Sequence, residues 1–269
     1  NLYSRTDLQD SKDALKRTSY FDDVEIEEDP VDKNTVDLKV KVKEASTGSI
    51  SGGIGYGSSD GLLLNAALSD TNIFGSGLQG QVSVDKSDRE LSGQISLTNP
   101  RIFDSEYSLG GTLYANDYDW RTYKERSYGF STTLGRKLTR NLSVSLTYNI
   151  EQSKITLKDD ELRDINTKTK KEIYREGKAI KSAITPALTY NSTDDYYLPR
   201  RGIIASTSFE IAGLGGDIDF IKNRTNFNYY LGLREYIDYD LILRYKASFG
   251  KIWERGYTPI NERLYLGGI

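Results

Sequence analysis

The chain is dominated by segments in which apolar and polar residues alternate. In residues 141–151, the apolar side chains Leu142, Val144, Leu146, Tyr148 and Ile150 are separated by Ser, Thr and Asn, and Glu closes the run. Strict alternation is typical of a β-strand with one apolar and one polar face. The polar positions are small and almost uncharged, as expected of a wall that faces a wet or polar interior. We therefore interpret this segment as one strand of a membrane-spanning barrel.

The same alternation recurs along most of the chain. It covers residues 50–57, 62–69, 78–85, 91–98, 107–116, 128–134, 142–151, 184–190, 203–212, 227–233 and 241–249. These lengths are close to the 9–11 residues with which a tilted strand crosses a bilayer. The fold class predicted is all-β, an antiparallel transmembrane β-barrel. Because single-chain bacterial barrels have an even number of strands, a run of about eleven predicts a barrel cut short in a loop.

Four segments interrupt the alternation. We interpret residues 117–120 as an aromatic, acidic loop, 154–181 as a long, charged, exposed loop, 213–216 as a glycine-rich loop, and 253–269 as a loop that does not return. A soluble all-β protein remains the alternative architecture. It is disfavoured because long strands with exposed Tyr and Leu would leave edges prone to aggregation.

Residues 1–45 follow a different pattern. Thr6 and Gln9 form a possible capping box that opens a short helix to about Arg17. Alternating segments at 21–27 and 36–42 predict two strands, and their polar positions are charged, which suits an aqueous compartment. We expect residues 1–45 to be the end of a small α/β module and residues 46–269 to be the barrel portion.

Composition excludes several classes of function. Thirty-six basic and 39 acidic residues give a net charge of −3, without the basic footprint of a nucleic-acid-binding protein. The mean hydropathy is −0.57, which a barrel tolerates because its apolar residues occupy alternate positions. The chain has no His and no Cys, so the commonest general base and metal ligand are missing. We expect no enzyme activity, no cofactor and no metal site; a barrel without Met at position 1 is expected to be a piece of a longer protein.

Five motifs occur in a fixed order along the chain. They are the glycine-rich strand Gly52–Gly57, the link with Asn72, Phe74, Gly75 and Gly77, the turn at Pro100, the turn with Pro199, Arg200, Arg201 and Gly202, and the stretch from Glu262 to Gly267 and Gly268. Their order and spacing resemble the Omp85 family of outer-membrane proteins. The module of residues 1–45 resembles the last POTRA domain of that family.

The resemblance implies a fold, a location and a set of partners. The family barrel has sixteen strands, of which about eleven would lie here, in the bacterial outer membrane, with the N-terminal module in the periplasm. The implied activity is folding and inserting β-barrel precursors, and the implied partners are unfolded outer-membrane protein precursors, assembly-complex lipoproteins and outer-membrane lipid. The Arg-Gly-aromatic tip of the family's sixth loop would follow Ile269, so Gly267 and Gly268 mark only the approach to it.

The first strand is the candidate site. It comprises Ile50, Gly52, Gly53, Ile54, Gly55, Tyr56 and Gly57. Glycine weakens a strand through backbone entropy and lost side-chain packing. A weak seam between this strand and the last one would leave backbone groups free to pair with an incoming strand. Alternatively, the glycines only relieve crowding beside the linker.

Two other functions remain open at this point. One is a polypeptide secretion or translocation barrel of the same family. The other is a passive porin-like channel, which would lack a soluble module such as residues 1–45.

Overall fold

The computed structural model describes residues 4, 6, 8–9, 11–12, 15, 20–31, 35–58, 60–158, 175–195, 198–234 and 239–264. Near the N-terminus, β1 (Phe21–Pro30) and β2 (Val36–Glu44) form an antiparallel two-stranded sheet. Both predicted strands are thus confirmed. Within the helix predicted from Thr6 to Arg17, residues 6, 8–9, 11–12 and 15 are described and are helical, and the others lie outside the described residues.

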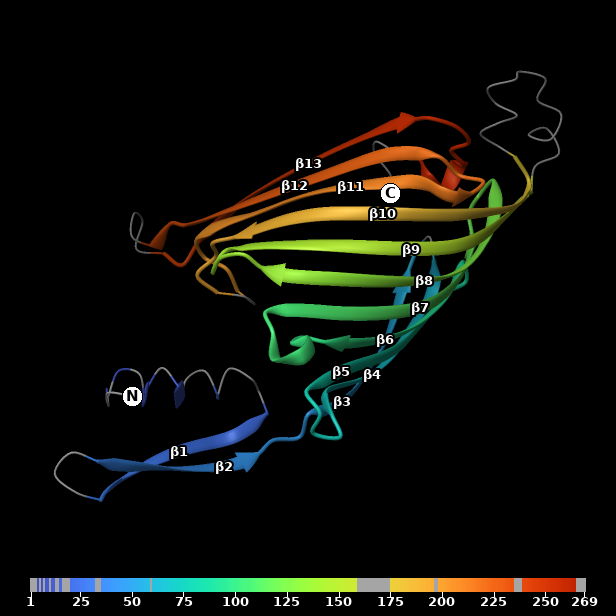
Figure 1. The fold of residues 1–269 in the computed structure, drawn as a ribbon. Helices are drawn as coiled ribbons and strands as arrows, with labels where there is room; N and C mark the ends of the chain where they lie inside the picture. The colour runs from blue at the N-terminus through green and yellow to red at the C-terminus, as the bar shows by residue number, and fades with distance from the viewer. Residues whose placement is uncertain are drawn as a thin grey trace.

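The remaining strands form one antiparallel sheet. They are β3 (Gly48–Gly57), β4 (Gly61–Ile73), β5 (Leu78–Lys86), β6 (Glu90–Asn99), β7 (Tyr107–Asp119), β8 (Tyr123–Lys137), β9 (Leu142–Leu157), β10 (Gly177–Asn191), β11 (Gly202–Gly216), β12 (Phe220–Gly232) and β13 (Ile242–Glu254). Each strand pairs with its neighbours in sequence, so the sheet is an eleven-stranded meander with β3 and β13 at its edges. Figure 1 shows the sheet as a curved wall in which the strands lie side by side. The predicted number of barrel strands is confirmed.

Alternation separates the two faces of this wall. The outer face carries apolar rows such as Val82, Ile95 and Leu113, which are cross-strand partners. Their side chains are 42%, 57% and 58% exposed, as expected of residues that meet lipid rather than a protein core. The inner face carries polar rows, for example Tyr114 opposite Gly129 on β8. The alternation of the sequence therefore becomes an apolar exterior and a polar interior.

The connections lie at two rims. The chain enters β3 from β2, so the even-numbered strands from β4 to β12 end at the end of the sheet that faces the N-terminal module. We call this end the proximal rim, and we call the links that follow these strands proximal links. The odd-numbered strands from β3 to β13 end at the opposite, distal rim.

Several strands extend further toward the distal rim than predicted. The loops predicted at 117–120 and 213–216 are wrong, because β7 continues to Asp119 and β11 continues to Gly216. On β7, Asp117 remains in the ladder because its carboxylate accepts a 2.8 Å hydrogen bond from Nε of its cross-strand partner Arg126. At the end of β11, Gly215 and Gly216 have positive φ values of 125° and 96°, a region that other residues avoid.

The bounds predicted for the charged loop, 154–181, are also wrong at both ends. β9 runs to Leu157 and β10 starts at Gly177, while residues 159–174 lie outside the described ranges. Within those ranges, no helix is long and apolar enough to cross a membrane.

The buried side chains gather where the segment after β13 covers the inner face. Ile260, in the short 3-10 helix η2 (Ile260–Glu262), packs with Tyr123, Ile155 and Leu157 of β8 and β9. A second cluster joins Ala179, Ala183, Ala212, Ile218 and Phe220, with Tyr257 packed against it. Residues 255–264, which we call the return segment, therefore fold back onto the wall; the prediction of a loop that does not return is corrected to this extent.

Candidate functional site

The seven residues predicted for the seam all lie on β3. Within the described ranges β3 pairs only with β4, so its other edge presents unpaired backbone groups. The outer-face side chains Ile50, Ile54 and Tyr56 are 85%, 76% and 81% exposed. Between β3 and β4, the Ser49 and Ser69 hydroxyls share a hydrogen bond of 2.8 Å. This edge strand is held mainly by its backbone ladder.

The glycines of β3 have room for side chains. A Cβ added at Gly52, Gly55 or Gly57 would meet its nearest neighbour at 3.6 to 3.8 Å, an ordinary contact distance. At Gly53 it would approach the side-chain amide of Asn65 to 2.7 Å, and that amide is the end of a flexible side chain. Crowding within the described sheet therefore does not explain why β3 is so rich in glycine. Two physical reasons for the glycines remain. They lower the stability of β3, or they allow a further strand to approach it closely.

The predicted turn motifs lie on the proximal rim, apart from the open backbone edge of β3. In the link after β4, the Asn72 side-chain oxygen accepts a 2.7 Å hydrogen bond from the N–H of Gly77. Phe74 and Gly75 both have positive φ, and Pro100 stands in the next proximal link. These residues shape tight turns, and no contact joins them to the edge strand as one site among the described side chains.

The link between β10 and β11 is organised by Asp194. Its Oδ1 accepts backbone hydrogen bonds from Arg200 at 2.9 Å and from Arg201 at 3.1 Å. These two N–H donors hold the pKa of the Asp194 carboxyl below its ordinary value. Gly202 has φ 112° and leaves no space, because a Cβ would lie 2.4 Å from the carbonyl oxygen of Ser192. Pro199 precedes these residues, so the motif is a turn closed by a carboxylate and a glycine.

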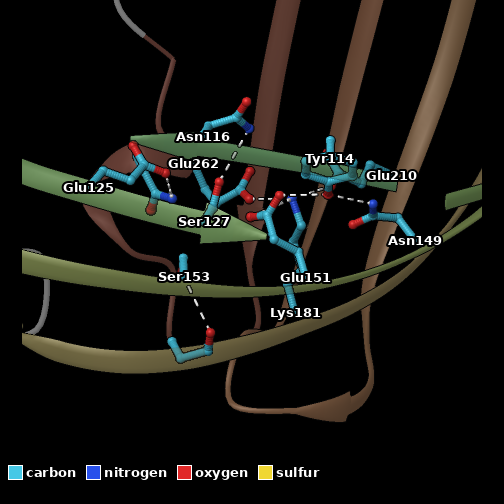
Figure 2. A network of polar contacts seen from close by, with 12 residues as sticks. Tyr114, Asn116, Glu125, Ser127, Asn149, Glu151, Ser153, Lys181, Glu210 and Glu262 are labelled. Carbon is cyan, nitrogen blue, oxygen red and sulfur yellow. Dashed lines mark hydrogen bonds and ion pairs between the residues drawn. The ribbon is translucent and has the colours of Figure 1, made fainter. Parts of the chain in front are cut away.

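The stretch predicted to approach the sixth loop reaches the inner wall through Glu262. Gly267 and Gly268 lie outside the described residues, but Glu262 is only 6% exposed. Its carboxylate pairs with the amino groups of Lys181 on β10 and Lys222 on β12, which are 9% and 3% exposed. Figure 2 shows Glu262 and Lys181 meeting in the interior together with residues from neighbouring strands.

Two further carboxylates complete this network. Glu210 on β11 lies 3.2 Å from the amino group of each lysine, and Glu151 on β9 lies 4.0 Å from that of Lys181. Three carboxylates thus surround two ammonium groups. Burying this many charges is tolerated only when they neutralise one another in good geometry.

Neutral side chains extend the network along the wall. Tyr114 donates a 2.7 Å hydrogen bond to Glu151 and accepts one of 2.8 Å from Asn149. At the other side, the Asn261 amide donates a 2.7 Å hydrogen bond to Glu125 on β8. The return segment therefore contacts strands from β8 to β12, which a short segment can do only on the concave face of the sheet.

Sequence reasoning missed this network. It placed Lys181 in an exposed loop, whereas the side chain is buried at the centre of the ion pairs. The available signal was the presence of Lys181, Glu210 and Lys222 at inner-face positions, where Ser, Thr and Asn otherwise dominate. In the part of the chain that the structure describes, no group of three or more His, Cys, Asp or Glu side chains could hold a metal ion.

Comparison with protein families gives two matches. The Omp85 superfamily domain matches residues 72–269, and a POTRA family model, surface antigen variable number repeat, matches residues 1–45. The outer membrane protein assembly factor BamA of Nitratidesulfovibrio vulgaris is 31% identical over 275 residues, covering 100% of this chain and 33% of that relative. BamA of Neisseria meningitidis serogroup B is 26% identical, covering 99% of this chain and 35% of that protein. The chain thus spans about a third of the length of these relatives.

Solved structures agree with these matches. The crystal structure of BamA from Haemophilus ducreyi lacking POTRA domains 1–3 superposes with a TM-score of 0.79 and 25% identity, covering 97% of this chain and 52% of that one. CdiB from Acinetobacter baumannii shares the fold with a TM-score of 0.55 and 16% identity, covering 94% of this chain and 48% of that one. The family model covers most of the eleven-stranded wall, and the chain belongs to the Omp85 superfamily.

Proposed function

We propose that this chain is the junction between the last POTRA domain and the first eleven barrel strands of an outer-membrane protein assembly factor. Residues 1–45 belong to the periplasmic module and residues 46–269 to the barrel in the bacterial outer membrane. The activity of the complete protein is to fold and insert β-barrel precursors. The likeness to BamA in both sequence and structure supports assembly over secretion.

The observation that carries the mechanism is the open, glycine-rich edge of β3. A free strand edge in a membrane is very unfavourable unless its backbone groups are paired. An incoming precursor strand satisfies those groups by adding to the sheet, and glycine lowers the cost of separating β3 from any strand that pairs with it between clients. The outer face beside this edge is apolar. The apolar side chains of an added strand would therefore contact lipid as soon as the strand pairs.

The proposed partners follow from this mechanism. Unfolded outer-membrane protein precursors are the substrates, and the N-terminal module guides them to the edge. Assembly-complex lipoproteins and outer-membrane lipid are the further partners of the complete protein. No cofactor takes part, because strand addition forms only hydrogen bonds and buries side chains.

A disulfide lock tests the seam. The chain has no Cys, so cysteines at Ser51 on β3 and at the facing position of the last strand of the complete protein give a defined crosslink. Closing it is expected to stop precursor assembly, and reduction is expected to restore it. A matched lock between Ala67 of β4 and Ser83 of β5, which are already cross-strand partners, should leave assembly intact. Full activity with β3 locked would contradict the proposal.

A further inference from the structure

Two neighbouring links of the proximal rim share a four-residue pattern. Residues 73–76 read Ile-Phe-Gly-Ser and join β4 to β5, while residues 102–105 read Ile-Phe-Asp-Ser and stand between β6 and β7. In each, the Ser N–H donates to the Ile carbonyl at 3.0 Å and the Ser hydroxyl donates to the same oxygen at 2.6 Å. The two turns are therefore built in the same way.

Both turns hold phenylalanine in a backbone conformation that suits it poorly. Phe74 has φ 50° and Phe103 has φ 51°, and the residue after each also has positive φ. Two successive positive φ values define a type I′ turn, whose first central position is normally Gly, Asn or Asp. For a bulky side chain this region is a genuine outlier. Local preference thus argues against Phe at both positions, and departures of this kind are expected where a side chain serves a function.

Neither ring packs against the protein. Phe74 and Phe103 are 101% and 100% exposed, which are the highest fractions among the large apolar side chains described. The turns therefore project both rings outward in a fixed geometry. The two hairpins are two strand spacings apart along the rim, which corresponds to about 10 Å.

The surroundings of the rings favour lipid as their partner. The Ile73 side chain lies over Gly80 on the outer face, so the lipid-facing surface continues up to the residue before Phe74. The link 74–77 carries no charge. In the second hairpin, Tyr107 and Arg136 form an outer-face cation–π pair, with 5.0 Å between guanidinium carbon and ring centroid. Aromatic and basic side chains are typical of the level of the lipid headgroups.

We propose that Phe74 and Phe103 insert into the periplasmic leaflet and anchor the first hairpins of the barrel at a fixed depth. The partner is a phospholipid surface, recognised through apolar contact rather than through a specific headgroup. This anchoring goes beyond the proposed assembly activity and does not depend on it. It places two rigid lipid contacts on the proximal rim, one between β4 and β5 and one between β6 and β7.

Depth-dependent quenching tests the anchor. In the complete protein, Phe74→Cys or Phe103→Cys is labelled with a polarity-sensitive fluorophore and reconstituted into phosphatidylcholine vesicles that contain headgroup-level nitroxide lipid. We expect several-fold stronger quenching by the nitroxide than for Arg140→Cys, an exposed residue of the next proximal link, and weaker quenching by aqueous iodide. Quenching by iodide as strong as at Arg140 would overturn the proposal. Protection from both quenchers would overturn it too, because the rings would then be covered by protein.

A second pair of variants separates anchoring from folding. Asn accepts positive φ more readily than Phe, so Phe74→Asn with Phe103→Asn preserves both turns while removing the rings. We expect the urea-unfolded double variant to insert into phosphatidylcholine vesicles several-fold more slowly, with an unchanged unfolding midpoint in detergent. Insertion at the unaltered rate would contradict the anchor even if precursor assembly by the complete protein were lost.

Discussion

Replacing Lys222 by Met tests whether the return segment is held by charge. Lys222 is 3% exposed and contacts Glu210 and Glu262. Methionine keeps the length of the side chain and removes its charge. The variant leaves three carboxylates around Lys181 alone, so at least two of them lose neutralisation in a site closed to water.

The expected loss in the free energy of unfolding follows from the numbers of carboxylates and lysines that each variant leaves in the network. Removing one partner of a buried ion pair costs about 3–5 kcal/mol, and Lys222→Met should lie in this range. Glu262→Gln leaves two lysines facing Glu151 and Glu210, a neutral set, and loses mainly charge-assisted hydrogen bonds, worth about 1.5–3 kcal/mol. The lysine variant is therefore the more damaging of the two. In the double variant the losses should not add, and the coupling should be about 0.5–3 kcal/mol.

The assay is urea unfolding of the complete protein in detergent, combined with trypsin cleavage at Arg263, whose side chain is 29% exposed. We expect Lys222→Met to lower the unfolding midpoint and to speed cleavage at Arg263. Lys246→Met, on the exposed inner face of β13, is the matched control and should change neither. Equal and additive losses from Lys222→Met and Glu262→Gln, with the return segment still protected, would refute the reasoning.

Three further predictions concern backbone and pH. Gly202→Ala should destabilise the protein by more than Gly75→Ala, because the Cβ at 202 meets a carbonyl oxygen at 2.4 Å whereas the one at 75 meets nothing within 4 Å; thermal unfolding compares them. Gly52→Val should leave stability unchanged or raise it but slow precursor assembly, whereas Gly93→Val on interior strand β6, which also has room, should not slow it; equal slowing by both would contradict a special role for β3. The depressed pKa of Asp194 stabilises the folded turn above the ordinary carboxyl value near 3.9, and this contribution is lost as the pH falls through the lower folded-state pKa. Unfolding midpoints from pH 6 to pH 2 should therefore fall less steeply in Asp194→Asn than in the unaltered protein.

The strands were predictable because alternation is a local property. Each strand of the wall buries or exposes every second residue, and the sequence records this directly, as in residues 141–151. The strand ends were harder, because beyond the bilayer a strand no longer needs an apolar face. Asp117 and Gly216 therefore look like loop residues although their backbones stay in the ladder.

The network around Glu262 could not be predicted in the same way. Lys181 and Glu262 are 81 positions apart, and only the curvature of the wall brings them together. Sequence indicates that a charge stands on the inner face but not which charge it meets. Phe74 was visible as a motif residue, but its positive φ depends on the hydrogen bonds of the turn.

The two edges of the wall differ in how their side chains hold them. On β13, Ser248 bonds to Asn226 at 3.0 Å and Glu254 pairs with Arg263 of the return segment at 2.9 Å. Between β3 and β4, the Ser49 and Ser69 hydroxyls share a hydrogen bond and apolar residues face one another across the two strands. β3 carries no charged residue, so its movement breaks no ion pair, whereas movement of β13 also disturbs the buried ion pairs through the return segment. If strand exchange occurs at one edge of this sheet, the energetic difference favours β3.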